Sequence, residues 1–148
     1  MRARSVSLAC IATFATACGS SDAPIPPACA GGPNAIERAL RAAPGRVALS
    51  DGTLLSQCVE RATSDADLQT FGELATTVAE RLEARSSREP HAALELGYLV
   101  GAARRGAATT NGIHVELARR LERSGAEVTG AEAQAALMRG LRAGERSG

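Results

Sequence analysis

The strongest periodic pattern in the chain lies between residues 64 and 86. Apolar residues recur there at alternating spacings of three and four, which places them on one face of a helix. They are Leu68, Phe71, Ala75, Val78 and Leu82. Ser64 and Asp67 precede the pattern with the spacing of a capping box, and Ser86-Ser87 follows it. The pattern therefore predicts one long amphipathic helix.

The next segment, residues 92–103, is apolar on nearly every side except at Glu95. Twelve residues are too few to cross a bilayer, so the segment predicts a buried central helix, with Pro90 in its first turn. Gly97 and Gly101 lie one turn apart and would permit close backbone contact.

Shorter helices are predicted on either side of this pair. Asn34, with Glu37 as its capping-box partner, would begin a first helix that stops at Pro44-Gly45. The segment Thr109–Gly112 would cap a fifth helix, and Thr129 with Glu132 would cap a sixth. The expected inward faces consist of Ile36, Leu40 and Ala43, of Ile113, Leu117 and Leu121, and of Ala133, Ala136, Leu137, Gly140 and Leu141.

Residues 47–55 allow two interpretations. An Asp51-Gly52 turn between apolar residues is typical of a short hairpin. The same residues can form a helix capped by Asp51, with Leu54, Leu55, Cys58, Val59 and Ala62 on one side, and this spacing favours the helix. The expected fold is all-α, a small bundle of about five to six short helices over residues 34–145, with a possible hairpin at 47–55.

The beginning of the chain has a different character. A short basic segment, Met1–Arg4, precedes the apolar or small residues of Val6–Ala15, which suits a secretory signal. Ala15-Thr16-Ala17-Cys18 then resembles the lipobox of bacterial lipoproteins. The resemblance implies cleavage after residue 17 and a diacylglycerol on the Cys18 thiol, with palmitate among its acyl groups. Ala15 replaces the usual Leu of that motif, which leaves an ordinary signal-peptidase cut nearby as the alternative.

Residues 18–33 contain Pro24, Pro26, Pro27 and Pro33 among small residues. Because this density of proline excludes a regular helix or a central strand, we expect a semi-extended tether.

Two cysteines remain after export and lipidation, Cys29 and Cys58. In an oxidising compartment two such thiols usually form a disulfide. The alternative is a shared metal site, which the absence of a C-x-x-C pair and the presence of only two His disfavour. We therefore expect a disulfide and no metal.

The charge pattern restricts the function. All 17 basic residues are Arg, which excludes chemistry that needs Lys. Loss of Arg2 and Arg4 with the signal would leave 15 Arg and 16 acidic residues, a net charge of −1. A near-neutral chain with 2% aromatic residues is a poor candidate for nucleic-acid binding.

The sequence offers few catalytic groups and no cofactor motif. His91 and His114 are expected at helix surfaces, and Asp51, Asp65 and Asp67 as caps. The best candidate interaction surface consists of Arg104, Arg105, Arg119, Arg120 and Arg123, although arginines near helix C-termini also complement the helix dipole.

These observations together predict a lipid-anchored protein of the cell envelope that acts as a non-enzymatic interaction or structural module and meets an envelope protein partner. An enzyme or small-ligand-binding domain without a recognisable motif is the alternative.

Overall fold

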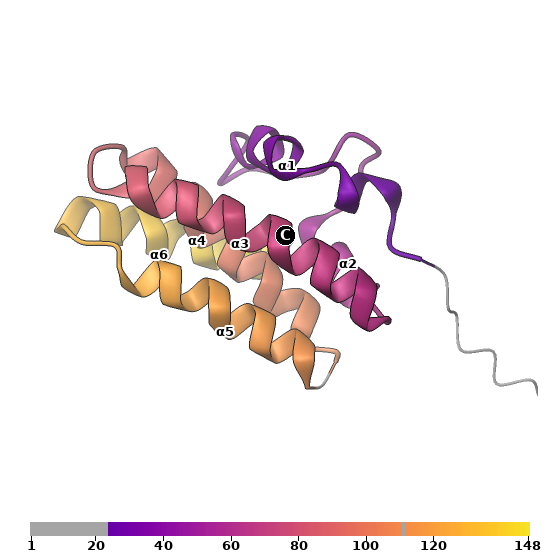
Figure 1. The fold of residues 1–148 in the computed structure, drawn as a ribbon. Coiled ribbons are helices and arrows are strands. Elements are labelled where there is room, and N and C mark those ends of the chain that lie inside the picture. Colours follow the sequence, from indigo (N-terminus) through magenta and orange to yellow (C-terminus); the bar gives the residue numbers. More distant parts are fainter. Residues whose placement is uncertain (1–23, 111) are drawn as a thin grey trace, which may run out of the picture.

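The computed structural model describes residues 24–110 and 112–148, and these residues form helices but no strand. The elements are the 3-10 turn η1 (Pro27–Ala30) and the helices α1 (Pro33–Leu40), α2 (Leu55–Glu60), α3 (Asp65–Ser86), α4 (Pro90–Ala107), α5 (Ile113–Ala126) and α6 (Ala131–Ser147) (Figure 1). The predicted all-α class is confirmed. The predicted leader and the predicted lipidation site at Cys18 lie outside the described residues.

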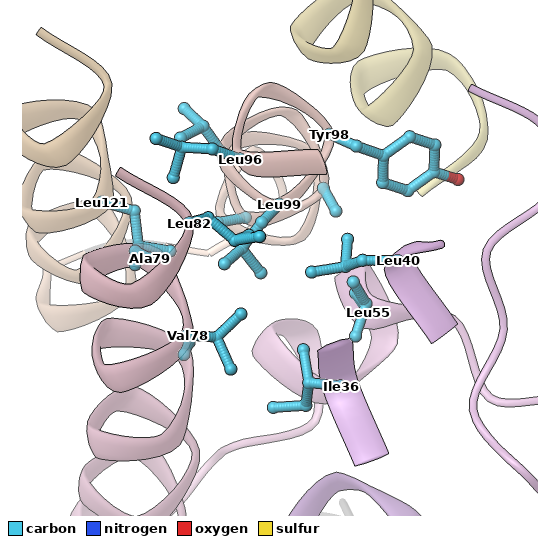
Figure 2. Packing of buried hydrophobic residues seen from close by; sticks show 14 of the residues in the cluster. Ile36, Leu40, Leu55, Val78, Ala79, Leu82, Leu96, Tyr98, Leu99 and Leu121 are labelled. Carbon is cyan, nitrogen blue, oxygen red and sulfur yellow. The ribbon is translucent and has the colours of Figure 1, made fainter. Parts of the chain in front are cut away.

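Helix α4 is the centre of the domain. It packs against α2, α3, α5 and α6 and is buried along nearly its whole length, because its residues are apolar or small on every side. Leu96 and Leu99 lie among side chains from the other helices (Figure 2). The predicted buried central helix is confirmed, and it extends one turn beyond the predicted end at residue 103.

Helices α4 and α6 lie with their backbones in direct contact. A Cβ atom added to Gly97 would lie 2.0 Å from the carbonyl oxygen of Leu137, and one on Gly140 would lie 1.9 Å from that of Leu94. Gly101 and Gly144 repeat this arrangement one turn further along each helix. Because the contacts advance in the same direction on both helices, α4 and α6 run parallel, and α5 is the return segment between them.

Helix α3 begins and ends as the sequence predicts. The Ser64 side chain accepts a hydrogen bond from the Asp67 backbone N at 3.1 Å, which caps the first turn. The five residues of its predicted apolar face are all buried. The face packs against α4, with Leu82 beside Leu99, and Val78 lies opposite Ile36 of α1 in the core (Figure 2).

The predicted caps of α1 and α6 are wrong. Helix α1 begins at Pro33, after Gly32, rather than being capped by Asn34, and α6 begins after Gly130 rather than after Thr129. Gly32 and Gly130 have φ values of 88° and 92°, a region that favours glycine, so the chain changes direction at these residues and the helix starts immediately after them.

The segment 47–55 is a loop with a tight turn. The Leu49 backbone N donates to the Thr53 carbonyl oxygen at 2.8 Å, and the Asp51 side chain accepts from the Thr53 backbone N at 2.9 Å. Because Asp51 binds the backbone of its own turn, it does not cap a helix, and α2 starts at Leu55 instead. The preferred helix from Asp51 is therefore wrong; the Asp-Gly turn is present, but no described residue pairs as a strand.

Part of the predicted tether belongs to the folded domain. Ile25 and Cys29 are buried, and Cys29 forms a disulfide with Cys58 of α2, with the two Cα atoms 5.6 Å apart. The predicted disulfide is confirmed. It fixes η1 against the helices, so the folded part begins near residue 25 rather than at residue 34.

Candidate functional site

The most unusual side chain of the core is Glu95, in the second turn of α4. Glu95 is an acidic residue, yet it is only 6% exposed, and its neighbours Leu94 and Leu96 on α4 are apolar and buried. Its Oε1 atom lies 3.3 Å from Nε2 of His91, one turn earlier on the same helix, and the His91 side chain is 57% exposed. A buried acidic group is energetically costly unless it is paired, so its presence in this helix requires an explanation.

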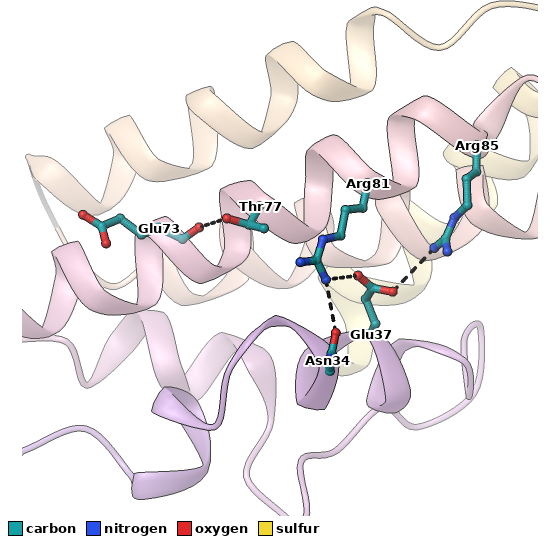
Figure 3. Close-up of polar contacts among 6 residues, drawn as sticks. All are labelled: Asn34, Glu37, Glu73, Thr77, Arg81 and Arg85. Carbon is teal, nitrogen blue, oxygen red and sulfur yellow. Dashed lines mark hydrogen bonds and ion pairs between the residues drawn. The ribbon is translucent and has the colours of Figure 1, made fainter.

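A second carboxylate holds α1 against α3 nearby. Glu37 accepts from Nη1 of Arg81 at 3.1 Å and lies 3.7 Å from Nη2 of Arg85, while Arg81 also donates to Asn34 at 3.2 Å (Figure 3). These contacts replace the predicted capping box, because the Asn34 and Glu37 side chains bind α3 instead of the first turn of α1. The residues Asn34 and Glu37 therefore fasten two helices together.

The two carboxylates border one cleft between α1, the end of α3 and the start of α4. Its volume is about 310 Å³, and its lining is formed by Glu37, Arg41, Arg85, Glu89, His91, Ala92 and Glu95. The Nε atom of Arg85 is buried and has no hydrogen-bond partner among the described residues. We call this site the polar cleft.

Burial raises the pKa of Glu95 above its ordinary value, because water no longer solvates the carboxylate. The positive charges of His91, Arg85 and Arg41 act in the opposite direction, and the negative charge of Glu37 adds to the rise. A titratable group with a shifted pKa in a cleft is a common sign of a functional site. The cleft presents both signs of charge, so it can hold a polar ligand.

The five arginines of the predicted interaction surface do not share one environment. Arg104 donates to Glu122 of α5 at 2.7 Å and to Glu145 of α6 at 3.1 Å. Arg105 donates to the backbone carbonyl oxygens of Glu145 and Arg146, at the end of α6. These two side chains join α4 to its neighbours.

The arginines of α5 point to different sides of that helix. Arg119 lines a shallow groove with Arg104, between α4 and α5. Arg120 lines a larger groove of about 500 Å³ between α3 and α5, and Arg123 lies 3.8 Å from Glu116 on α5 itself. Arg119 and Arg120 are thus the exposed members of the set without an ion pair to a described residue.

His114 has a structural environment. Its Nε2 atom lies 2.9 Å from the carbonyl oxygen of Ala62, which connects the start of α5 to the end of α2. Within residues 24–110 and 112–148, no group of three or more His, Cys, Asp or Glu side chains is placed to hold a metal ion. None of the helices in this part of the chain is long and apolar enough to cross a membrane.

Sequence reasoning did not identify the polar cleft. The one signal was Glu95 itself, a charged residue inside an otherwise apolar helix; Arg41 and Arg85 come from other helices and could not be connected to it. Compared with protein-family models, curated proteins and solved structures, the chain has no match.

Proposed function

We propose that this chain is a lipoprotein of the bacterial cell envelope, anchored through Cys18, whose helical domain acts by binding rather than by catalysis. The observation that carries the placement outside the cytoplasm is the Cys29–Cys58 disulfide, in which both residues are fully buried. Disulfides persist in oxidising compartments outside the cytoplasm, which is where the basic and apolar leader would direct the chain.

The short connection to the expected anchor supports a role at the membrane surface. Ile25 is already buried in the domain, so only residues 19–24 separate it from Cys18. The seven residue steps from Cys18 to Ile25 span at most about 25 Å when fully extended. A domain held this close to lipid headgroups meets partners in the membrane or immediately above it, which is a reason to favour binding to an envelope protein.

Fractionation and intact mass measurement test the anchor. We expect the mature protein in the membrane fraction, beginning at Cys18 and carrying acyl groups. Cys18→Ser should lose the acyl mass, whereas Cys10→Ser, which changes a thiol of the predicted leader, should leave the mature mass unchanged. A Cys18→Ser protein with its lipid still attached would contradict the proposal.

Arg119 and Arg120 are the residues of choice for testing the partner surface, since Arg104 and Arg105 bind other parts of the domain. Reversing both charges to Glu should reduce cross-linking to an envelope protein in intact cells, with the helical circular dichroism spectrum unchanged. Reversal of Arg139 and Arg142, two exposed arginines of α6, is the matched control. Equal loss in both variants would show only a general charge effect, and turnover of a substrate by the purified protein would overturn the non-enzymatic assignment.

The polar cleft favours a second candidate function, the binding of a small ligand. A concave site with a few convergent charged groups is the usual form of such sites. The same ion pairs also fasten α1 to α3, so ligand binding has to be measured directly.

A further inference from the structure

We infer that the polar cleft binds a compact zwitterion, a molecule that carries an ammonium group and a carboxylate group a few bonds apart, as an α-amino acid does. This inference deepens the second candidate function above and does not depend on the lipid anchor. It rests on the positions of the acidic and basic side chains that line the cleft.

Glu95 supplies the acidic side. Its side chain is more than nine-tenths buried, and its only ion-pair partner among the described residues is His91, at 3.3 Å. His91 approaches only the Oε1 atom of Glu95, and its own side chain is 57% exposed to solvent. An ammonium group in the cleft would add a second positive partner and would donate hydrogen bonds to Glu95.

Arg41 and Arg85 supply the basic side. Arg41 makes no ion pair with a described residue, and its charge is close enough to Glu95 to act on that carboxyl group. Arg85 lies 3.7 Å from Glu37 through Nη2 and its side chain is 40% exposed, while its buried Nε–H has no acceptor among the described residues. A carboxylate placed between Arg85 and Arg41 would receive charge-assisted hydrogen bonds from the two guanidinium groups.

The cleft is lined by both acidic and basic side chains, and this favours a zwitterion over an ion with a single charge. A plain anion would approach Glu95 and Glu89 as well as the arginines, and a plain amine would approach Arg41 as well as the carboxylates. Only a ligand with both charges matches both sides of the cleft. A volume of about 310 Å³ is at the lower end of small-molecule sites, which suits a single amino acid better than a peptide.

Three probes of matched size test the inference on the purified mature protein with its disulfide intact. L-Alanine carries both charges, ethylamine lacks the carboxylate, and propionate lacks the ammonium group. Binding is followed by NMR through the amide signals of α1 and of the first turns of α4, which border the cleft. We expect L-alanine to bind at least about tenfold more tightly than either truncated probe.

Two variants test which side chain binds each charged group of the ligand. Glu95→Gln should weaken binding of L-alanine about tenfold or more and leave the weak binding of propionate unchanged, while Arg41→Ala should weaken L-alanine and leave ethylamine unchanged. Arg88→Ala is the control, because Arg88 is an exposed arginine between α3 and α4 that does not line the cleft. Circular dichroism verifies that each variant is folded.

Three results would overturn the inference. L-alanine could give no shifts at the cleft, the three probes could bind equally, or Arg88→Ala could weaken L-alanine as much as Arg41→Ala does. Because none of these measurements reports on the lipid or on an envelope partner, the inference can fail while the proposed lipoprotein function stands, and the reverse also holds.

Discussion

Gly97 of α4 lies against the carbonyl oxygen of Leu137 in α6, so closely that a Cβ atom on it would come within 2.0 Å of that oxygen. Gly140 of α6 makes the reciprocal contact with the carbonyl oxygen of Leu94. Neither helix can carry a side chain at these positions without moving away from the other. The small residues therefore set the separation of the two helices that form the centre of the domain.

Replacing Gly97 with Ala should destabilise the protein strongly, because the new methyl group meets backbone atoms that cannot rotate away. We expect the free energy of unfolding to fall by about 3 kcal/mol, as for other overpacked cores. Urea unfolding of Gly97→Ala measures this loss.

Gly72 of α3 provides the matched control. A Cβ atom there would lie 3.6 Å from Cδ1 of Leu117, an ordinary contact, and Ala is the better helix former. Gly72→Ala should leave the protein as stable as the parent or more so. Equal destabilisation by the two variants would show that the contact between α4 and α6 is not the cause.

Loss of the Cys29–Cys58 disulfide should lower the free energy of unfolding. The bond closes a loop of 29 residues, for which the chain-entropy model gives about 3–4 kcal/mol. Urea unfolding should give a lower free energy of unfolding for the reduced protein than for the oxidised protein. Peptide mapping under non-reducing conditions confirms the pairing. The double variant Cys29→Ala/Cys58→Ala should match the reduced parent and should not respond to reductant.

Glu95 should make stability depend on pH. Since burial raises the pKa of Glu95 in the folded protein, the folded state binds this proton more tightly than the unfolded state does. The stabilisation that comes from this tighter proton binding is complete below the ordinary pKa of about 4.5, and it is lost as pH rises through the raised pKa of the folded state. Glu95→Gln should remove this decline and be more stable than the parent at neutral pH. A variant with the same pH profile as the parent would contradict the assignment.

Arg104 should contribute to stability, whereas Arg119 should not. Arg104 bridges Glu122 and Glu145 on two other helices, and Arg119 has no ion pair with a described residue. Arg104→Gln should lower the free energy of unfolding by roughly 1 kcal/mol, since exposed ion pairs contribute little individually but this one belongs to a network. Added salt should reduce the difference between the variant and the parent. Arg119→Gln should unfold at the same urea concentration as the parent.

The features that could be predicted from sequence are those set by residues close together in the chain. Ser64 caps α3 because its partner is three residues away, and the apolar spacing after it identified the buried face. The pairing of Cys29 with Cys58 followed from counting the thiols that would be left after the predicted cleavage of the leader and lipidation of Cys18. Gly97 was correctly associated with close backbone contact.

The features that escaped prediction depend on distant partners. Glu37 has the spacing of a capping-box residue, yet it binds Arg81 and Arg85, which lie 44 and 48 positions later and only become neighbours when α1 packs on α3. Glu95 looked like an isolated charge for the same reason. Asp51 was misinterpreted as a cap because an Asx turn and a helix start use the same side-chain acceptor, and only the path of the chain distinguishes them.

The parallel arrangement of α4 and α6 sets an order for folding. During synthesis α4 emerges first, and its glycine face has no partner until α5 has reversed the chain and α6 has followed. A chain that has progressed only through α5 therefore exposes backbone and apolar surface at Gly97 and Gly101, which invites aggregation. The domain can complete its core only once α6 is available, and we expect it to depend on chaperone protection in that interval.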